Sequence, residues 1–164
     1  MTNLTFRDIQ LYVFTLLDNI RLYSSDVYIY FQIMSDTGVR PIELYNLSGW
    51  SIYDFQPIIL KPAKKNNERL FAEGSLPEEY VKLVKGFETS LPLLKPAYLS
   101  RYVKQARPFT IYCKSKEVTS YIFRYYFIKN LSEQGFSPLD IQIITGHTNI
   151  SVVIGYINTT IYKK

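Results

Sequence analysis

Residues 37–44 read Thr-Gly-Val-Arg-Pro-Ile-Glu-Leu, and this stretch decides the fold. A helical pattern precedes it, and Gly38 is suited to end that helix because glycine accepts left-handed backbone angles without a Cβ clash. Pro41 favours the first turn of a new, short helix that carries Glu43. The stretch therefore predicts a corner between two helices, with Arg40 held at that corner by the local backbone.

Three further segments follow along the chain. YIFR ends at Arg124, TGH ends at His147, and Tyr156 lies nine residues after that histidine. Two arginines suit a phosphodiester, because a guanidinium is permanently charged and its planar fork matches phosphate oxygens. A tyrosine phenol becomes a nucleophile when a base or a nearby positive charge activates it. Together with the Arg40 corner, these segments predict one site that holds a phosphodiester.

The order and spacing of the segments resemble the catalytic domain of the tyrosine recombinases, the phage integrase family. In that family, Thr-Gly-hydrophobic-Arg-x-x-Glu-Leu supplies the first catalytic arginine and His-x-x-Arg the second. Leu-Gly-His then precedes the nucleophilic tyrosine by nine residues. The resemblance runs from about residue 5 to the C-terminus. It implies site-specific DNA recombination, in which a strand is cleaved and rejoined through a 3′-phosphotyrosine intermediate without a metal or cofactor.

The resemblance also implies a role for each matched residue. Arg40 and Arg124 bind the scissile phosphate, where preorganised positive charge stabilises the transition state. His147 contacts the same phosphate, Tyr121 assists, and Tyr156 attacks. The alternative for each arginine alone is a surface or ion-pair role, and for a lone histidine it is a structural hydrogen bond.

Protonation of the leaving 5′-oxygen requires a mobile acid, which a lysine with a lowered pKa can supply. The resemblance places this lysine on a β-hairpin in a Lys-x-x-x-x-Arg segment, which Lys64 and Arg69 fit. Lys61 and Lys65 are rivals for this role. The alternative for all three lysines is a solvated hairpin tip.

Several positions depart from the family pattern or allow two interpretations. Tyr121 stands in place of the usual histidine, and a phenol with a pKa near 10 is a poor proton acceptor at neutral pH. Thr145 replaces a leucine and Val153 a common threonine, and neither side chain is expected to do chemistry. Glu43 either orients the active-site arginine, as in the family, or is a helix-start carboxylate that favours the helix dipole.

The composition of the chain limits its possible partners and its cellular compartment. The net charge of +5 suits a polyanionic partner, and DNA contacts are expected from Lys61, Lys65, Arg101 and Lys104. Cys113 is the only cysteine, which excludes an intramolecular disulfide and fits a reducing, intracellular compartment such as the cytoplasm or nucleoid. Apolar stretches are too short for a membrane span and no signal pattern opens the chain, so no membrane partner is expected.

Periodicity and capping signals predict a mainly α fold with a small antiparallel β-sheet, an α+β domain. Strands at 50–61 and 69–72 form a hairpin with a basic tip. Helices are predicted at 6–20, 26–36, a short segment after Pro41, 75–87, 96–106, 116–133, 137–144 and a last segment capped by Asn149.

The length predicts a single catalytic domain spanning residues 1–164. Family members generally carry an N-terminal DNA-binding domain that closes a clamp around the duplex, and this chain leaves no room for it. Weak, salt-sensitive binding to double-stranded DNA is therefore expected. The expected partners are a separate clamping domain or partner recombinase and, through self-association on DNA, further copies of the chain. The apolar residues of the tail, Ile157, Ile161 and Tyr162, dock on a neighbouring protomer, dock in cis, or fray.

Two other functions share these residues. A degenerate relative would bind DNA or a recombinase without cutting, which Tyr121 and the missing clamp favour. A type IB topoisomerase-like enzyme would use the same arginine and tyrosine chemistry to relax DNA, although the spacing from TGH to Tyr156 favours a recombinase.

Overall fold

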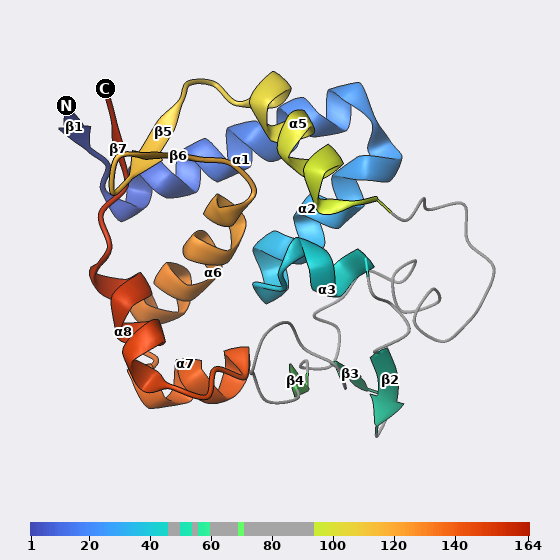
Figure 1. Ribbon diagram of the computed structural model, residues 1–164, viewed down its shortest axis with the longest axis vertical. Coiled ribbons are helices and arrows are strands. Elements are labelled where there is room, and N and C mark those ends of the chain that lie inside the picture. The colour runs from blue at the N-terminus through green and yellow to red at the C-terminus, as the bar shows by residue number, and fades with distance from the viewer. Residues whose placement is uncertain (46–49, 54–55, 60–68, 71–93) are drawn as a thin grey trace.

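The computed structural model describes residues 1–45, 50–53, 56–59, 69–70 and 94–164. Most of this part of the chain is helical, as predicted (Figure 1). Its helices are α1 (Phe6–Tyr23), α2 (Ser25–Thr37), α3 (Pro41–Tyr45), α5 (Pro96–Ala106), α6 (Tyr121–Glu133), α7 (Pro138–Thr145) and α8 (Ile150–Asn158). Its strands are β1 (Thr2–Asn3), β2 (Trp50–Tyr53), β3 (Gln56–Ile59), β4 (Arg69–Leu70), β5 (Ile111–Cys113), β6 (Lys116–Val118) and β7 (Tyr162–Lys163).

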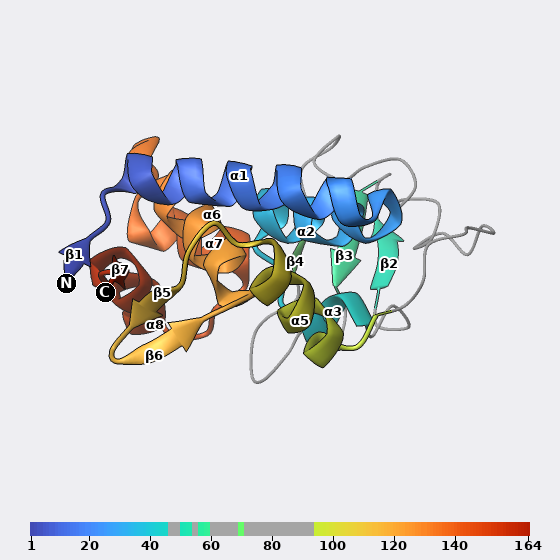
Figure 2. The same cartoon turned by 90° about the horizontal axis from the view of Figure 1, so that it is seen from above.

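Helix α1 covers α2 and α6 and buries one apolar stripe against them (Figure 2). Thr5 caps its N-terminus as predicted, within a capping box completed by Asp8. The stripe contains Ile9, Val13 and Leu16, which recur at helical spacing and are at most 1% exposed. The aromatic rings of Phe31 on α2 and Phe123 on α6 meet at 5.2 Å in the same core. This packing fixes α6, the helix that carries Arg124.

The two ends of the chain meet in an antiparallel sheet of strand order β1-β7-β5-β6 (Figure 1). Tyr162 of β7 pairs with Asn3 on one side and Tyr112 on the other. Ile161, just before β7, is fully buried in the main core, and its carbonyl accepts from the Leu4 amide at 2.9 Å. The structure therefore has the tail docked in cis, one of the alternatives considered from the sequence.

A second sheet, of strand order β2-β3-β4, corresponds to the predicted hairpin. The predicted strand 50–61 is wrong in one respect, because its residues form two antiparallel strands that pair Trp50 with Ile59 and Tyr53 with Gln56. The predicted basic tip with Lys61, Lys64 and Lys65, and the predicted helix 75–87, lie outside the described residues.

The predicted helix at 116–133 is wrong over its first turns. Residues Lys116–Val118 form strand β6, and α6 begins only at Tyr121. The strand turns back on β5 through Lys114 and Ser115, which both adopt positive φ angles of 48° and 64°. Tight two-residue turns favour Asn and Gly at such positions, so the Lys-Ser pair gave no turn signal in the sequence.

The predicted corner at Gly38 is confirmed. Gly38 ends α2 in the left-handed conformation, with φ of 69°, and α3 begins at Pro41. A Cβ at this glycine would lie under 3.0 Å from the ring of Phe127. The backbone angle and the ring both demand glycine here.

We expect Gly38→Ala to lower the free energy of unfolding by about 2–4 kcal/mol, from left-handed strain and overpacking together. Gly155→Ala is the matched control, because a Cβ there meets nothing within 4 Å inside α8 and should be neutral or stabilise by up to about 1 kcal/mol. Urea unfolding followed by circular dichroism measures both. Equal losses in the two variants would contradict this account of the corner.

Candidate active site

Two helix ends of the same construction border the site. Helix α2 ends in Thr37-Gly38 and α7 ends in Thr145-Gly146, and both glycines adopt the left-handed conformation. Each threonine hydroxyl donates to the carbonyl one turn earlier, Thr37 to Ile33 at 2.6 Å and Thr145 to Ile141 at 2.8 Å. Arg40 and His147 lie directly after these turns, so backbone geometry sets the positions of both residues.

Arg124 connects these two turns. Its side chain is only 4% exposed, one guanidinium nitrogen donates to the Gly38 carbonyl, and the other terminal nitrogen lies 2.8 Å from His147 Nε2. Burial of a charge is costly unless it is hydrogen-bonded, and these contacts supply such bonds. They also fix the plane of the guanidinium.

Glu43 holds the Arg40 corner from the other side. Its buried carboxylate accepts the Arg40 backbone N–H at 3.2 Å, and the Arg40 carbonyl accepts from the Glu43 amide at 2.9 Å. The carboxylate also lies in the first turn of α3, where negative charge favours the helix dipole. The two interpretations of Glu43 are thus compatible, since it orients the backbone of Arg40 from a helix start.

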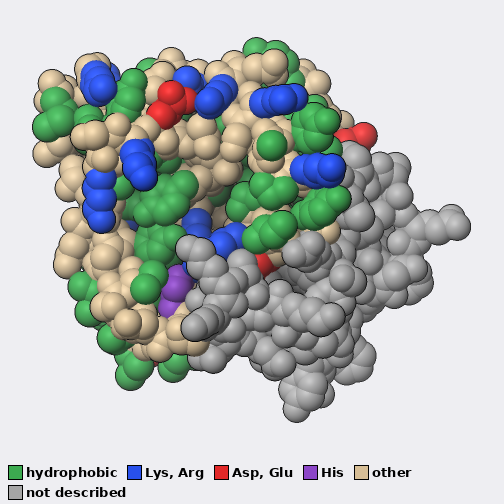
Figure 3. Space-filling view, viewed as in Figure 1, with side chains coloured by type: hydrophobic (Ala, Val, Ile, Leu, Met, Phe, Trp, Pro, Cys, Tyr) green, Lys and Arg blue, Asp and Glu red, His purple; other side chains and the backbone are tan. Residues whose placement is uncertain are grey.

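A pocket of about 420 Å³ is lined by four of the predicted residues, Arg40, Tyr121, Arg124 and Tyr156. Figure 3 shows basic side chains in the hollow at the centre of one face, next to the histidine. Tyr121 and Arg124, three residues apart on α6, share a face of that helix, because both line this pocket. The lining consists of Val39, Arg40, Pro41, Ile42, Pro96, Ser120, Tyr121, Arg124 and Tyr156.

Tyr156 lies on α8, which Asn149 caps as predicted by accepting from the Ser151 amide at 2.9 Å. Its ring stacks on that of Tyr121, with centroids 5.4 Å apart and planes 20° from parallel. The Arg124 Cζ lies 5.8 Å from the Tyr156 ring centroid, and the His147 ring centroid lies 6.0 Å away. The half-buried Tyr156 therefore lies beside three of the other predicted residues, Tyr121, Arg124 and His147.

Tyr121 differs chemically from the histidine that the family pattern expects. Burial raises the pKa of Tyr121 above its ordinary value, and the nearby Tyr156 raises it further by a smaller amount. The phenol therefore stays protonated at neutral pH and can donate a hydrogen bond. It is unsuited to act as a base there, as the sequence predicted.

Thr145 is the site residue that sequence reasoning missed. No chemical role was predicted at this position, yet the Thr145 hydroxyl lies 2.6 Å from His147 Nδ1, and both side chains are buried. The only sequence signal was the departure itself, a hydroxyl in place of a leucine. A polar group at a buried position requires a partner, and here His147 is one.

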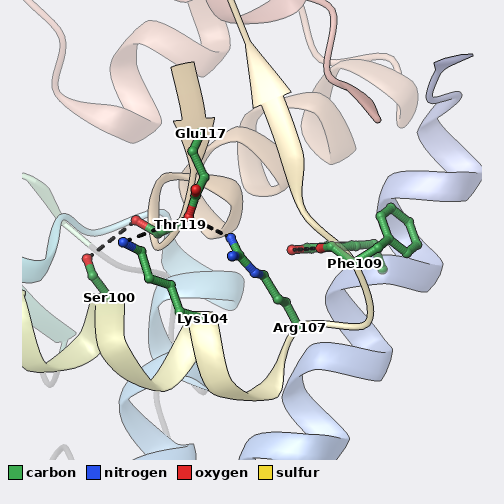
Figure 4. A network of polar contacts seen from close by, with 7 residues as sticks. Ser100, Lys104, Arg107, Phe109, Glu117 and Thr119 are labelled. Carbon is green, nitrogen blue, oxygen red and sulfur yellow. Dashed lines mark hydrogen bonds and ion pairs between the residues drawn. The ribbon is translucent and has the colours of Figure 1, made fainter. Parts of the chain in front are cut away.

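The basic residues predicted to bind DNA on α5 lie outside the pocket lining. The Glu117 carboxylate on β6 forms ion pairs with Arg107 at 2.7 Å and with Lys104 at 3.9 Å (Figure 4). The Thr119 hydroxyl donates a hydrogen bond to the Ser100 hydroxyl at 3.4 Å. Arg101 is exposed, with its Cζ 5.3 Å from the Tyr98 ring centroid. These contacts tie α5 to the β5–β6 hairpin and leave Arg101 and Lys104 on the surface.

Among the described residues, no group of three or more His, Cys, Asp or Glu side chains is placed to hold a metal ion. Within the same residues, every helix is too short or too polar to cross a bilayer.

Solved structures resemble the fold of this chain. XerA recombinase matches with a TM-score of 0.62 over 89% of this chain, at 18% identity. The chain has the fold of a tyrosine recombinase catalytic domain. XerH site-specific recombinase, bound to a palindromic difH substrate in a post-cleavage complex, matches with a TM-score of 0.57 over 88% of the chain, at 16% identity.

The Tn1549 transposon integrase, in complex with circular intermediate DNA, matches with a TM-score of 0.54 over 86% of this chain at 18% identity. The chain spans about half the length of these tyrosine recombinase structures, covering 56% of XerA, 47% of XerH and 58% of the Tn1549 integrase. No family model and no curated protein matches it.

Proposed function

We propose that this chain is the catalytic part of a site-specific recombinase that cleaves and rejoins double-stranded DNA through a 3′-phosphotyrosine intermediate. The observation that carries the proposal is the convergence of Arg40, Arg124 and Tyr156 on one pocket, with His147 bonded to Arg124. Arg40 precedes α3, Arg124 lies on α6, and His147 follows α7. Tyr156 lies on α8, so the four residues are up to 116 positions apart in the sequence, from 40 to 156. The tyrosine recombinase fold supports the same class of reaction.

In the proposed cleavage step, the Tyr156 phenol oxygen forms a bond to phosphorus while the bond from phosphorus to the 5′-oxygen breaks. Arg40 and Arg124 bind the phosphate oxygens, whose negative charge increases in the transition state. Lys64 gives a proton to the leaving 5′-oxygen, with Lys61 and Lys65 as rivals, and the phenol proton is released to solvent. Rejoining reverses these steps, so the reaction consumes no cofactor.

Double-stranded DNA is the proposed partner. The net charge of +5 favours it, and Arg101 and Lys104 present positive charge on the surface of α5. A separate clamping domain or partner recombinase, together with self-association on the DNA, completes the proposed assembly. Among the structures of similar fold, the Tn1549 integrase is in complex with circular intermediate DNA and XerH is bound to a palindromic difH substrate.

A nicked suicide substrate tests the proposal, because loss of the short cleaved fragment prevents rejoining and traps the enzyme on DNA. We expect a covalent protein–DNA adduct that survives denaturing electrophoresis, and mass spectrometry should locate the linkage on the peptide containing Tyr156. Binding is verified in parallel by fluorescence anisotropy. Bound DNA without any adduct, even with a partner recombinase supplied, would overturn the proposal.

That negative outcome would select the alternative of a DNA-binding relative that does not cut. Tyr121 favours this alternative, because it stands at the usual histidine position and its phenol stays protonated. Relaxation of supercoiled plasmid without any site requirement would instead select a topoisomerase-like activity.

A further inference from the structure

The protons of the Thr145–His147–Arg124 contacts can be assigned from their chemistry. A guanidinium only donates hydrogen bonds, so His147 Nε2, 2.8 Å from the terminal nitrogen of Arg124, accepts and carries no proton. A neutral imidazole then holds its proton on Nδ1, which lies 2.6 Å from the Thr145 hydroxyl oxygen. The Thr145 oxygen accepts that proton and donates its own to the Ile141 carbonyl at 2.8 Å.

These hydrogen bonds link three buried residues in a chain, which we call the relay. Thr145 is 0% exposed, His147 2% and Arg124 4%. A buried polar group that loses its partner costs free energy, so each member restricts the next. The relay begins at the C-terminal turn of α7, and Gly146 bends the chain so that His147 faces back toward Thr145.

We infer that Thr145 is a positioning residue. It fixes His147 as the neutral Nδ1–H tautomer, and Nε2 thereby holds the Arg124 guanidinium in the plane that faces the pocket. The inference rests on the proposed function for its catalytic consequence, because there Arg124 binds the scissile phosphate. Both ring nitrogens are bonded within the protein, one to Thr145 and one to Arg124.

His147 is the only histidine in the chain, so its tautomer can be measured directly. In protein labelled with ¹⁵N-histidine at about pH 8, above the ordinary histidine pKa of about 6.5, one pair of ring nitrogens reports the state. We expect a protonated Nδ1 and an unprotonated Nε2. This measurement requires no DNA.

Thr145→Val removes the hydroxyl and keeps the shape of the side chain. We expect it to shift the tautomer ratio of His147 toward Nε2–H by about tenfold, because the buried Nδ1–H loses its acceptor. The rate of adduct formation should fall by about tenfold for the same reason. Thr145→Ser keeps the hydroxyl and should restore both readouts. Thr37→Val is the matched control for the tautomer alone, since it removes the same hydroxyl from the equivalent turn of α2.

An Nε2–H tautomer in the wild-type protein would overturn the inference without any variant. An unchanged tautomer in Thr145→Val, or in Thr145→Ala should the valine variant not fold, would overturn it as well. A shift of equal size in Thr37→Val would show a general effect of these turns and contradict a specific role for Thr145. Failure of the proposed function is distinguishable, because the wild-type adduct would then be missing while the tautomer result stands.

Discussion

Tyr156→Phe should abolish the covalent protein–DNA adduct completely, whereas Tyr121→Phe should retain it. The phenylalanine keeps the ring that stacks 5.4 Å from Tyr121 and that lies 5.8 Å from the Arg124 Cζ. Packing is therefore preserved, and the only loss is the oxygen that forms the bond to phosphorus. Phenylalanine has no atom that can replace it, so no residual adduct is expected from this position.

The comparison matters because two stacked tyrosines line the same pocket. Burial raises the pKa of Tyr121, which opposes formation of the phenolate that a nucleophile requires. We expect Tyr121→Phe to slow adduct formation only by about threefold to tenfold, the scale of one lost hydrogen bond. Denaturing electrophoresis of the nicked suicide substrate measures both variants.

Anisotropy under the same conditions shows whether each variant still binds DNA. An adduct that persists in Tyr156→Phe and disappears in Tyr121→Phe would make Tyr121 the nucleophile. Loss of the adduct in both variants, with folding and DNA binding intact, would contradict the limited role assigned to Tyr121.

The parts of the site that the sequence predicted correctly depend on local backbone chemistry. Gly38 ends α2 in the left-handed conformation, Pro41 opens α3, and Asn149 caps α8. Such signals act over one turn of helix, so they can be read without knowledge of the tertiary fold. The positions of Arg40 and Tyr156 within their elements follow from these signals.

The parts that the sequence did not predict depend on partners distant in the chain. Strand β6 forms because its backbone pairs with β5. The turn between them has Lys114 and Ser115 at positive φ, and the sequence has no glycine there to indicate a turn. The role of Thr145 required the position of His147 relative to Arg124, which lies on another helix. Tertiary packing placed the tail in cis, where Ile161 is buried, and no local pattern distinguishes this from docking on a neighbour.

Arg124→Lys should reduce the rate of adduct formation by about a thousandfold, the upper range for removal of one preorganised donor to a transition-state oxyanion. The guanidinium bridges two elements, since its terminal nitrogens contact the Gly38 carbonyl and His147 Nε2. An ammonium is a point charge without a planar fork, so it cannot hold both contacts in one plane and also face the pocket. The charge is retained in this variant, and the expected loss therefore measures geometry. Single-turnover kinetics on the suicide substrate is the appropriate measurement.

Arg21→Lys is the matched control, because it makes the same chemical change at an exposed arginine in the last turn of α1. Its Cζ lies 5.7 Å from the Tyr28 ring centroid, outside the pocket lining, so the adduct rate should be unchanged. Arg124→Lys should also lower the free energy of unfolding by about 1–3 kcal/mol, because the buried partners of the guanidinium lose hydrogen bonds. Circular dichroism melting separates this loss from the loss of activity, provided that the rates are measured well below the melting transition. A lysine variant that remains folded and retains the rate within about tenfold would show that charge alone suffices at this position, and would contradict the bridging role of Arg124.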